Sequence, residues 1–181
     1  MKRGINRALL SGVNRAIYEN QNIQHANCVF ISHKSEDIEI AKQIADLLQA
    51  EGVDVYLDVN DSGLQIATKE GNADEIVKCI EKALMVNTDI LVLVTDKTKE
   101  SWWVPYEVGF AKMGKKSIAS LLLKNVSEFP DYLKIEKKLN GLADLKRYIN
   151  EKQSLPTFME SVKAGGIAKD IEAKLLNYIR G

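Results

Sequence analysis

Cysteine, histidine and proline are scarce in this chain of 181 residues, which has two cysteines, two histidines and three prolines. The spacing of Cys28, Cys79, His25 and His33 matches no metal-ligand pattern, so no metal site is predicted. Two distant cysteines in apolar surroundings are typical of reduced, buried thiols. The scarcity therefore excludes a disulfide-stapled secreted domain and predicts a cytoplasmic protein.

Net charge and long hydrophobic runs are missing as well. Lys plus Arg and Asp plus Glu each number 25, so the chain has no global basic field that would bind nucleic acid or an anionic membrane. No stretch approaches the roughly 20 apolar residues of a membrane span, and residues 1–27 lack the apolar block of a secretory signal. A hydrophobic content of 45% instead predicts one globular domain that binds neither nucleic acid nor membranes.

Residues 1–24 predict an amphipathic helix ahead of the main fold, because apolar side chains recur there at helical spacing among basic ones. The apolar set is Ile5, Leu9, Val13 and Ile17, and the basic set is Lys2, Arg3, Arg7 and Arg15. We expect this N-terminal helix over residues 1–25 and the main domain, with a C-terminal helical extension, over residues 26–181. The helix is expected to pack on the domain or on a sister subunit, with a membrane-surface role as the alternative.

Strand-like and helix-like segments alternate from residue 28 onward. The predicted strands are residues 28–32, 53–57, 90–94 and 118–123. Helices are predicted from Ser35 to Gly52, over 73–84, around Glu107 as far as Gly114, and at the C-terminus from Ile167 to Ile179. Residues 58–72, rich in Asp, Asn and Gly, predict a long loop, and residues 131–150 predict mostly helix with a short fifth strand.

This alternation predicts an α/β fold, in which a central parallel sheet of about five strands has helices on both faces. Ligands bind such sheets beyond the carboxyl ends of the strands. Three segments are expected at that edge: Ser32–Lys34, the loop from Asp58, and Lys97–Tyr106, which carries both tryptophans. Glu107 follows directly at the same edge, so the sequence predicts a binding site there.

Glu107 is the first candidate functional residue. Wound as an α-helix, residues 103–111 place Glu107 near the middle of a broad apolar arc. A carboxylate in such surroundings is costly unless it is paired or has a task, and burial raises its pKa. The alternative is structural: in a helix that starts at Pro105, Glu107 is the third residue and caps a free backbone amide.

Several of these segments resemble the TIR (Toll/interleukin-1 receptor) domain. Residues 29–33 (VFISH) followed by 35–37 (SED) are similar to its first strand and turn, and residues 53–58 with the loop after them to its second strand and BB loop. Trp103 and Glu107 resemble the Trp-x-x-x-Glu motif of its enzymatic branch. The likeness covers residues 27–125, and the whole resembles small stand-alone bacterial TIR proteins of anti-phage systems such as Thoeris.

The resemblance implies a flavodoxin-like TIR fold and NAD⁺ as the substrate, with no cofactor. Enzymatic TIR domains cleave the bond between nicotinamide and ribose, and they release ADP-ribose, cyclise it or transfer it to an acceptor. Nicotinamide leaves as a neutral molecule, so one carboxylate suffices where most glycosidases need two. Glu107 is then the expected catalytic residue, which stabilises an oxocarbenium-like transition state and orients the ribose.

The other expected substrate-binding residues are Phe30, Ser32, His33, Asp58 and Trp103. Phe30 is expected on the nicotinamide side of the pocket, with a plain core position as the alternative. Trp103 offers a flat face for a ring of the substrate, and one tryptophan of the pair is expected to pack inward and the other at the rim. His33 and Asp58 line the same edge, although Asp58 also suits the start of a turn.

Two other functions stay open. Residues 106–111 and 114–118 also resemble an element of nucleoside deoxyribosyltransferases, in which the glutamate is a nucleophile. A non-enzymatic TIR module that works by assembly is the other alternative, although a pure scaffold has no need of Glu107. The resemblance further implies a homo-oligomer formed through TIR–TIR contacts and a downstream effector that responds to a nucleotide product.

Overall fold

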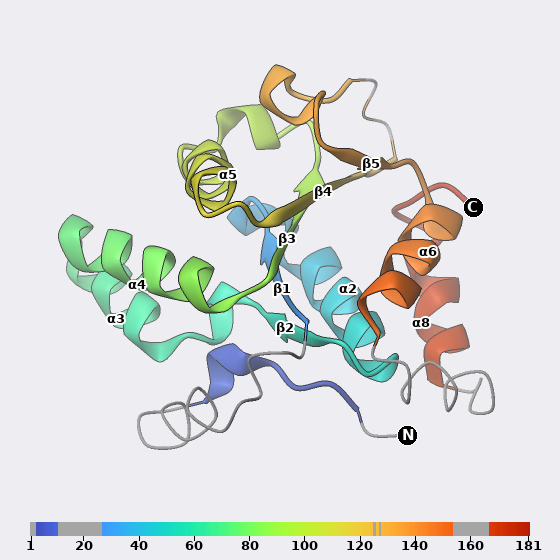
Figure 1. Ribbon diagram of the computed structural model, residues 1–181, viewed down its shortest axis with the longest axis horizontal. Coiled ribbons are helices and arrows are strands. Elements are labelled where there is room, and N and C mark those ends of the chain that lie inside the picture. Colours follow the sequence, from blue (N-terminus) through green and yellow to red (C-terminus); the bar gives the residue numbers. More distant parts are fainter. Residues whose placement is uncertain (1–2, 11–26, 125, 127, 154–166) are drawn as a thin grey trace.

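Five parallel strands form one sheet in the order β2-β1-β3-β4-β5 (Figure 1). The computed structural model describes residues 3–10, 27–124, 126, 128–153 and 167–181. The strands are β1 (Cys28–Ser32), β2 (Asp54–Tyr56), β3 (Asp89–Val94), β4 (Ser117–Leu122) and β5 (Lys137–Leu139). The predicted α/β fold with a parallel sheet is therefore confirmed, including its short fifth strand.

Helices cover both faces of the sheet (Figure 1). One face carries α2 (Ile38–Ala50), α6 (Leu142–Lys152) and α8 (Ile167–Leu175), and the other carries α3 (Ser62–Glu70), α4 (Ala73–Val86) and α5 (Trp103–Met113). The 3-10 helices are η1 (Arg7–Leu9), η3 (Ser35–Asp37), η4 (Asp58–Asn60), η5 (Thr98–Glu100) and η6 (Asp131–Leu133). Because β2 and β3 lie on opposite sides of β1, the chain changes direction there, and ligands bind at this point in sheets of this type.

The central strand β3 contains an unbroken apolar run, residues 90–94, because it is covered on both faces. All six of its residues are buried. Leu91 and Leu93 pack in the core on the α2 face, whereas Ile90, Val92 and Val94 pack in the core on the α5 face. Alternate residues of a strand point to opposite faces, and both faces here are covered, so residues 90–94 are all apolar, whereas the buried Asp89 is paired with Lys152.

The prediction of a long loop over residues 58–72 is wrong, because this segment contains η4 and α3. The Asp61 side chain caps α3 by accepting hydrogen bonds from the backbone amides of Gly63 (2.9 Å) and Leu64 (3.2 Å). Leu64 and Ala67 are buried, and Gly71 ends the helix with a left-handed φ of 64°. The Asp- and Gly-rich composition therefore marks the two ends of a short helix.

Residues 3–10, here called the N-terminal strap, run along the outer side of β2. The backbone amide of Val55 donates to the carbonyl of Ile5 (2.9 Å), and Asn6 pairs with Val55 in parallel. Arg7 forms an ion pair with Asp54 at 2.9 Å. Of the helix predicted over residues 1–25, the strap contains only the 3-10 turn η1, and its remaining residues are not helical. Residues 1–2 and 11–25 of that prediction lie outside the described part.

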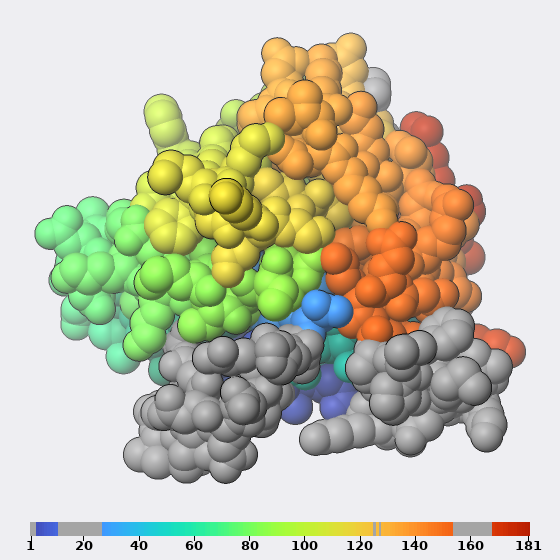
Figure 2. Space-filling model, in the orientation of Figure 1, coloured from blue at the N-terminus to red at the C-terminus, as the bar shows by residue number. Residues whose placement is uncertain are grey.

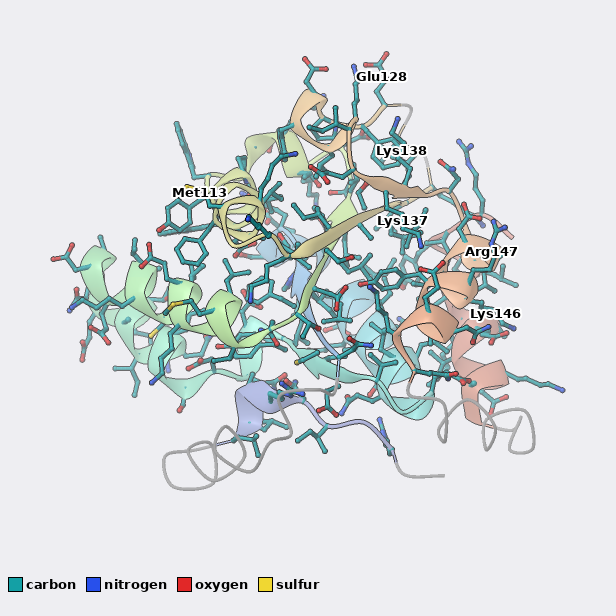
Figure 3. The ribbon with its side chains drawn as sticks, in the orientation of Figure 1. Met113, Glu128, Lys137, Lys138, Lys146 and Arg147 are labelled. Atoms are coloured by element: carbon teal, nitrogen blue, oxygen red, sulfur yellow. The ribbon has the colours of Figure 1, made fainter. Side chains whose placement is uncertain are left out.

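The visible surface mixes charges of both signs. Figure 2 shows a face on which residues from α4 to α6, coloured green to orange, lie side by side. Four basic residues of β5 and α6, Lys137, Lys138, Lys146 and Arg147, are labelled in Figure 3. Three of them have acidic partners, because Lys137 pairs with Glu151, Lys146 with Glu172 and Arg147 with Asp144.

Both cysteines are free thiols, and burial raises the pKa of Cys28. Cys28 is buried as expected, but Cys79 is only half-buried. Among the described residues, no three or more His, Cys, Asp or Glu side chains gather as a metal site would require. No helix in the described part of the chain has the length and apolar character that crossing a bilayer requires.

Candidate active site

Glu107 is buried on α5, with 5% of its surface exposed. The helix begins at Trp103, so Pro105 lies in its first turn, where the missing N–H group leaves no bond unmade. Glu107 therefore lies in the second turn, between Val104 and Val108, which are also buried. This position rules out the structural alternative, in which Glu107 caps the first turn of a helix that begins at Pro105.

The partner of Glu107 comes from a distant part of the sequence. Ser32, the last residue of β1, donates a hydrogen bond from its hydroxyl to Oε2 of Glu107 at 2.6 Å. Both side chains are buried. The carboxyl end of β1 and the start of α5 are thus joined at the edge of the sheet where ligands were expected.

Phe30 lies two residues before Ser32 in β1 and points to the same face of the sheet. Its ring stacks on Tyr56 of β2 with the ring centroids 5.4 Å apart and the planes 10° apart. Phe30 is 1% exposed and packs in the core on the α5 face. Phe30 is therefore a core residue. It also forms an apolar floor next to Ser32, at the base of the site.

His33 and Asp58 form a second polar pair at this edge. The Nε2 atom of His33 lies 3.9 Å from Oδ1 of Asp58, which also accepts a hydrogen bond from the backbone amide of Val59 at 2.7 Å. The Nδ1 atom of His33 lies 3.2 Å from the carbonyl oxygen of Ile31. Asp58 thus starts the turn η4, as the structural alternative predicted, and in the same position it faces His33.

Burial raises the pKa of both carboxyl groups of the site. Burial raises the pKa of Glu107 to about 8, with the hydrogen bond from Ser32 opposing the shift and the charge of Asp58 adding to it. Burial also raises the pKa of Asp58, and the nearby His33 opposes that rise. Asp58 follows β2, and Ser32, the partner of Glu107, ends the neighbouring β1, so the two carboxyl groups belong to the same edge of the sheet although they come from different elements.

The two tryptophans lie at the rim, and neither is buried. Trp103 is 40% exposed and meets Tyr106 edge to face, with ring centroids 6.0 Å apart. Trp102 is 92% exposed. The expectation that one tryptophan packs inward is therefore wrong, because the core-facing positions of this turn are taken by Val104 and Glu107. Trp103 lies one helical turn from Glu107 and presents a partly free ring at the same edge.

Tyr56 and Tyr132 lie near the site, yet no sequence pattern singles them out. The hydroxyl of Tyr56 donates to Asp61, which ties β2 to the start of α3. Tyr132 lies in η6, where burial raises the pKa of its phenol and the charge of Glu107 adds to the rise. Their neighbours come from distant segments, so the local sequence gives no signal. Of the two, Tyr56 is the closer to being predicted, because it lies in the alternating strand predicted over residues 53–57.

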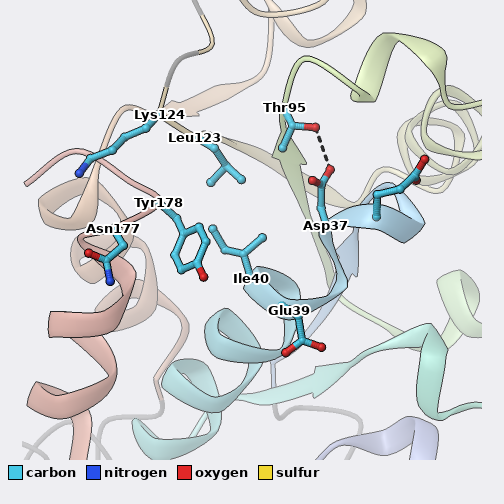
Figure 4. Close-up of a pocket in the computed structure, with 9 residues that line it drawn as sticks. Asp37, Glu39, Ile40, Thr95, Leu123, Lys124, Asn177 and Tyr178 are labelled. Carbon is cyan, nitrogen blue, oxygen red and sulfur yellow. Dashed lines mark hydrogen bonds between the residues drawn. The ribbon is translucent and has the colours of Figure 1, made fainter.

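A hollow of about 260 Å³ also opens at the carboxyl edge, on the α2 side (Figure 4). Its acidic lining residues are Glu36, Asp37 and Glu39, and Thr95 donates a hydrogen bond to Asp37 at 2.7 Å. Lys124 is the one cationic residue of the lining. The lining of this hollow therefore carries an excess of negative charge, which disfavours an anionic ligand there.

The site residues lie within the match to a known family. The family model of the TIR domain matches residues 29–156, well over half of the chain. The matched range holds Phe30, Ser32, His33, Asp58 and Glu107, whereas the N-terminal strap and α8 lie outside it. No curated protein matches the chain.

Proposed function

The chain belongs to the TIR domain family, and on this premise we propose that it cleaves the bond between nicotinamide and ribose in NAD⁺. The product is ADP-ribose in free, cyclic or transferred form. The observation that carries the proposal is Glu107, a buried carboxyl group held by Ser32 at the carboxyl edge of the sheet. A domain that serves only as a scaffold has no need of such a costly group.

Glu107 supplies what this reaction needs most. As the glycosidic bond breaks, positive charge builds on the ribose, and a carboxylate in a poorly solvated site stabilises that charge strongly. Nicotinamide leaves as a neutral molecule, so no general acid has to protonate it. The hydrogen bond from Ser32 fixes the direction of Oε2, so the carboxylate need not reorient during the reaction.

The charge state of Glu107 depends on the substrate. With a pKa of about 8, the Glu107 carboxyl group is mostly protonated at neutral pH when no ligand is bound. The nicotinamide ring of NAD⁺ is cationic, and a nearby positive charge lowers the pKa of a carboxyl group. Binding of NAD⁺ therefore favours release of the Glu107 proton. The negative charge needed for catalysis then forms when the substrate binds.

The remaining residues have roles that follow from their positions. We assign Trp103 to stacking on a ring of the substrate, because it is partly exposed one turn from Glu107. Phe30 and its partner Tyr56 form the apolar floor on the nicotinamide side. His33 and Asp58 line the side nearest η4 and hold the ribose or order the loop.

Mass spectrometry of NAD⁺ incubated with concentrated protein tests the proposal, with wild type beside Glu107→Gln. The variant keeps the size of the side chain but loses its charge, so we expect nicotinamide release to fall by at least about 100-fold while the fold survives. Equal turnover by both proteins would contradict the assignment of Glu107 as the catalytic residue. A parallel assay with a deoxynucleoside and a free base tests the deoxyribosyltransferase alternative.

A role in assembly is the second function that an observation favours. Trp102 and Trp103, 92% and 40% exposed, are two neighbouring aromatic side chains at the surface beside the site, and aromatic residues are enriched in protein interfaces. We propose that copies of the chain associate and that activity depends on this association. By analogy with Thoeris, the product then acts as a nucleotide signal to an effector in anti-phage defence. Measuring turnover per molecule over a range of protein concentrations tests this, since a constant value would contradict it.

A further inference from the structure

Tyr132 has a buried hydroxyl that finds no hydrogen-bond partner within the described part of the chain. Its ring packs in the core on the α5 face, in the same cluster as Val104 and Val108, which flank Glu107 on α5. Buried hydroxyls in folded proteins are almost always paired, because leaving one unpaired is destabilising. The hydroxyl of Tyr132 can therefore take a partner from outside the chain without giving up a hydrogen bond within the described residues.

The position of Tyr132 is well defined by its neighbours. It is the middle residue of η6, whose end is closed by a hydrogen bond from the backbone amide of Leu133 to the carbonyl of Pro130 at 2.9 Å. Leu133 is completely buried and anchors the turn in the core. The phenol is thus held in place by its neighbours in the chain as well as by the packing of its own ring.

Tyr132 packs against the cluster that holds Phe30 of β1 and Val108 of α5, the two elements that carry Ser32 and Glu107. Ser32 comes from β1 and already donates to the carboxylate. Tyr132 comes from the connection between β4 and β5, and burial with the charge of Glu107 raises its pKa. The phenol therefore stays protonated at neutral pH and is available both to donate and to accept a hydrogen bond.

We propose that the Tyr132 hydroxyl binds a hydroxyl group of the nicotinamide ribose and positions the sugar against Glu107. This inference rests on the proposed cleavage of NAD⁺. A ribose hydroxyl matches the phenol because each group both donates and accepts, whereas the pyrophosphate calls for a cation and the nicotinamide ring for an aromatic face. The unpaired hydroxyl gains its partner when the substrate enters.

Tyr132→Phe tests the proposal, because it removes one oxygen atom and leaves the ring. We expect kcat/KM for NAD⁺ to fall about 3- to 10-fold, while Tm stays the same or rises. Tyr148→Phe is the matched control: Tyr148 also has a buried hydroxyl without a partner among the described residues, but it lies on α6 near the ion pair of Asp89 and Lys152. It should leave kcat/KM unchanged.

Substrate analogues separate positioning from a general loss of packing. With NAD⁺ analogues that lack the 2′- or the 3′-hydroxyl of the nicotinamide ribose, one of the two should remove the difference in kcat/KM between wild type and Tyr132→Phe. A difference that persists with both analogues, or equal kcat/KM values with NAD⁺ itself, overturns the role of Tyr132 while cleavage of NAD⁺ stands. A wild type that neither binds nor cleaves NAD⁺ overturns the proposed function, and the role of Tyr132 with it.

Discussion

The buried carboxyl group of Glu107 makes stability and proposed activity depend on pH in opposite directions. Its pKa is raised from 4.5 to about 8 in the folded protein. The folded state therefore holds a proton that the unfolded state has released between these values. The contribution of Glu107 to stability is fully present below pH 4.5 and is lost as the pH rises through about 8. The carboxylate needed for catalysis becomes available over the same range.

Urea unfolding of wild type and Glu107→Gln between pH 5 and 9 measures this effect. We expect wild type to lose stability relative to the variant by at most about 1.4 kcal/mol per pH unit, with the loss levelling off above a pH of about 8. In wild type, kcat/KM should rise with pH over the same range and then reach a plateau. The exposed Glu70, replaced as Glu70→Gln, serves as the control and should show no such trend. A pH-independent difference between wild type and Glu107→Gln would contradict the shift.

Local sequence patterns predict Glu107 and Ser32 but not Tyr132. Glu107 stands out because helical periodicity surrounds it with apolar residues, and Ser32 because it ends an apolar strand. The carboxyl ends of parallel strands share one edge, so the pattern also brings Ser32 and Asp58 to the same side. Tyr132 lies in a short irregular connection, where no periodicity operates. Its relation to Glu107 depends on how distant segments pack.

At the scale of elements, α3 shows why composition misleads in short segments. Asp61 begins the helix and Gly71 ends it, so residues that are typical of loops occupy the two ends. Only Leu64 and Ala67 are buried, which leaves too few apolar residues for a helical period to be recognised. The longer elements β1, α2, α4 and β3 were predicted because each buries a full stripe or strand.

Asp61→Ala should destabilise the protein by about 1–3 kcal/mol. The substitution removes the cap of α3 and also the acceptor of the buried Tyr56 hydroxyl. Asn72→Ala is the matched comparison, because Asn72 caps α4 through one bond to the exposed backbone amide of Glu75 (3.2 Å), and we expect a loss of about 1 kcal/mol. Chemical denaturation gives both values. A smaller loss for Asp61→Ala than for Asn72→Ala would show that the bond to Tyr56 contributes nothing.

For the whole molecule, ion pairs offset the charge of three of the four basic residues named on β5 and α6. Lys137, Lys146 and Arg147 are each next to an acidic side chain. We expect no binding of labelled duplex DNA or RNA at physiological salt, measured by fluorescence anisotropy. The double variant Glu151→Gln with Glu172→Gln frees two of the lysines and should gain weak, salt-sensitive binding. Salt-sensitive binding by wild type would contradict the expectation.

Both borders of the sheet are protected against a further strand. At β2, the N-terminal strap already occupies the outer side, with Ile5 accepting the backbone bond from Val55. At β5, the strand is three residues long and carries the exposed Lys137 and Lys138, which discourage pairing with another chain. Within the described residues, a neighbouring copy therefore finds no long apolar strand to extend at either border. Fibre growth by strand addition is disfavoured, and copies of the chain are expected to meet through their helices and loops.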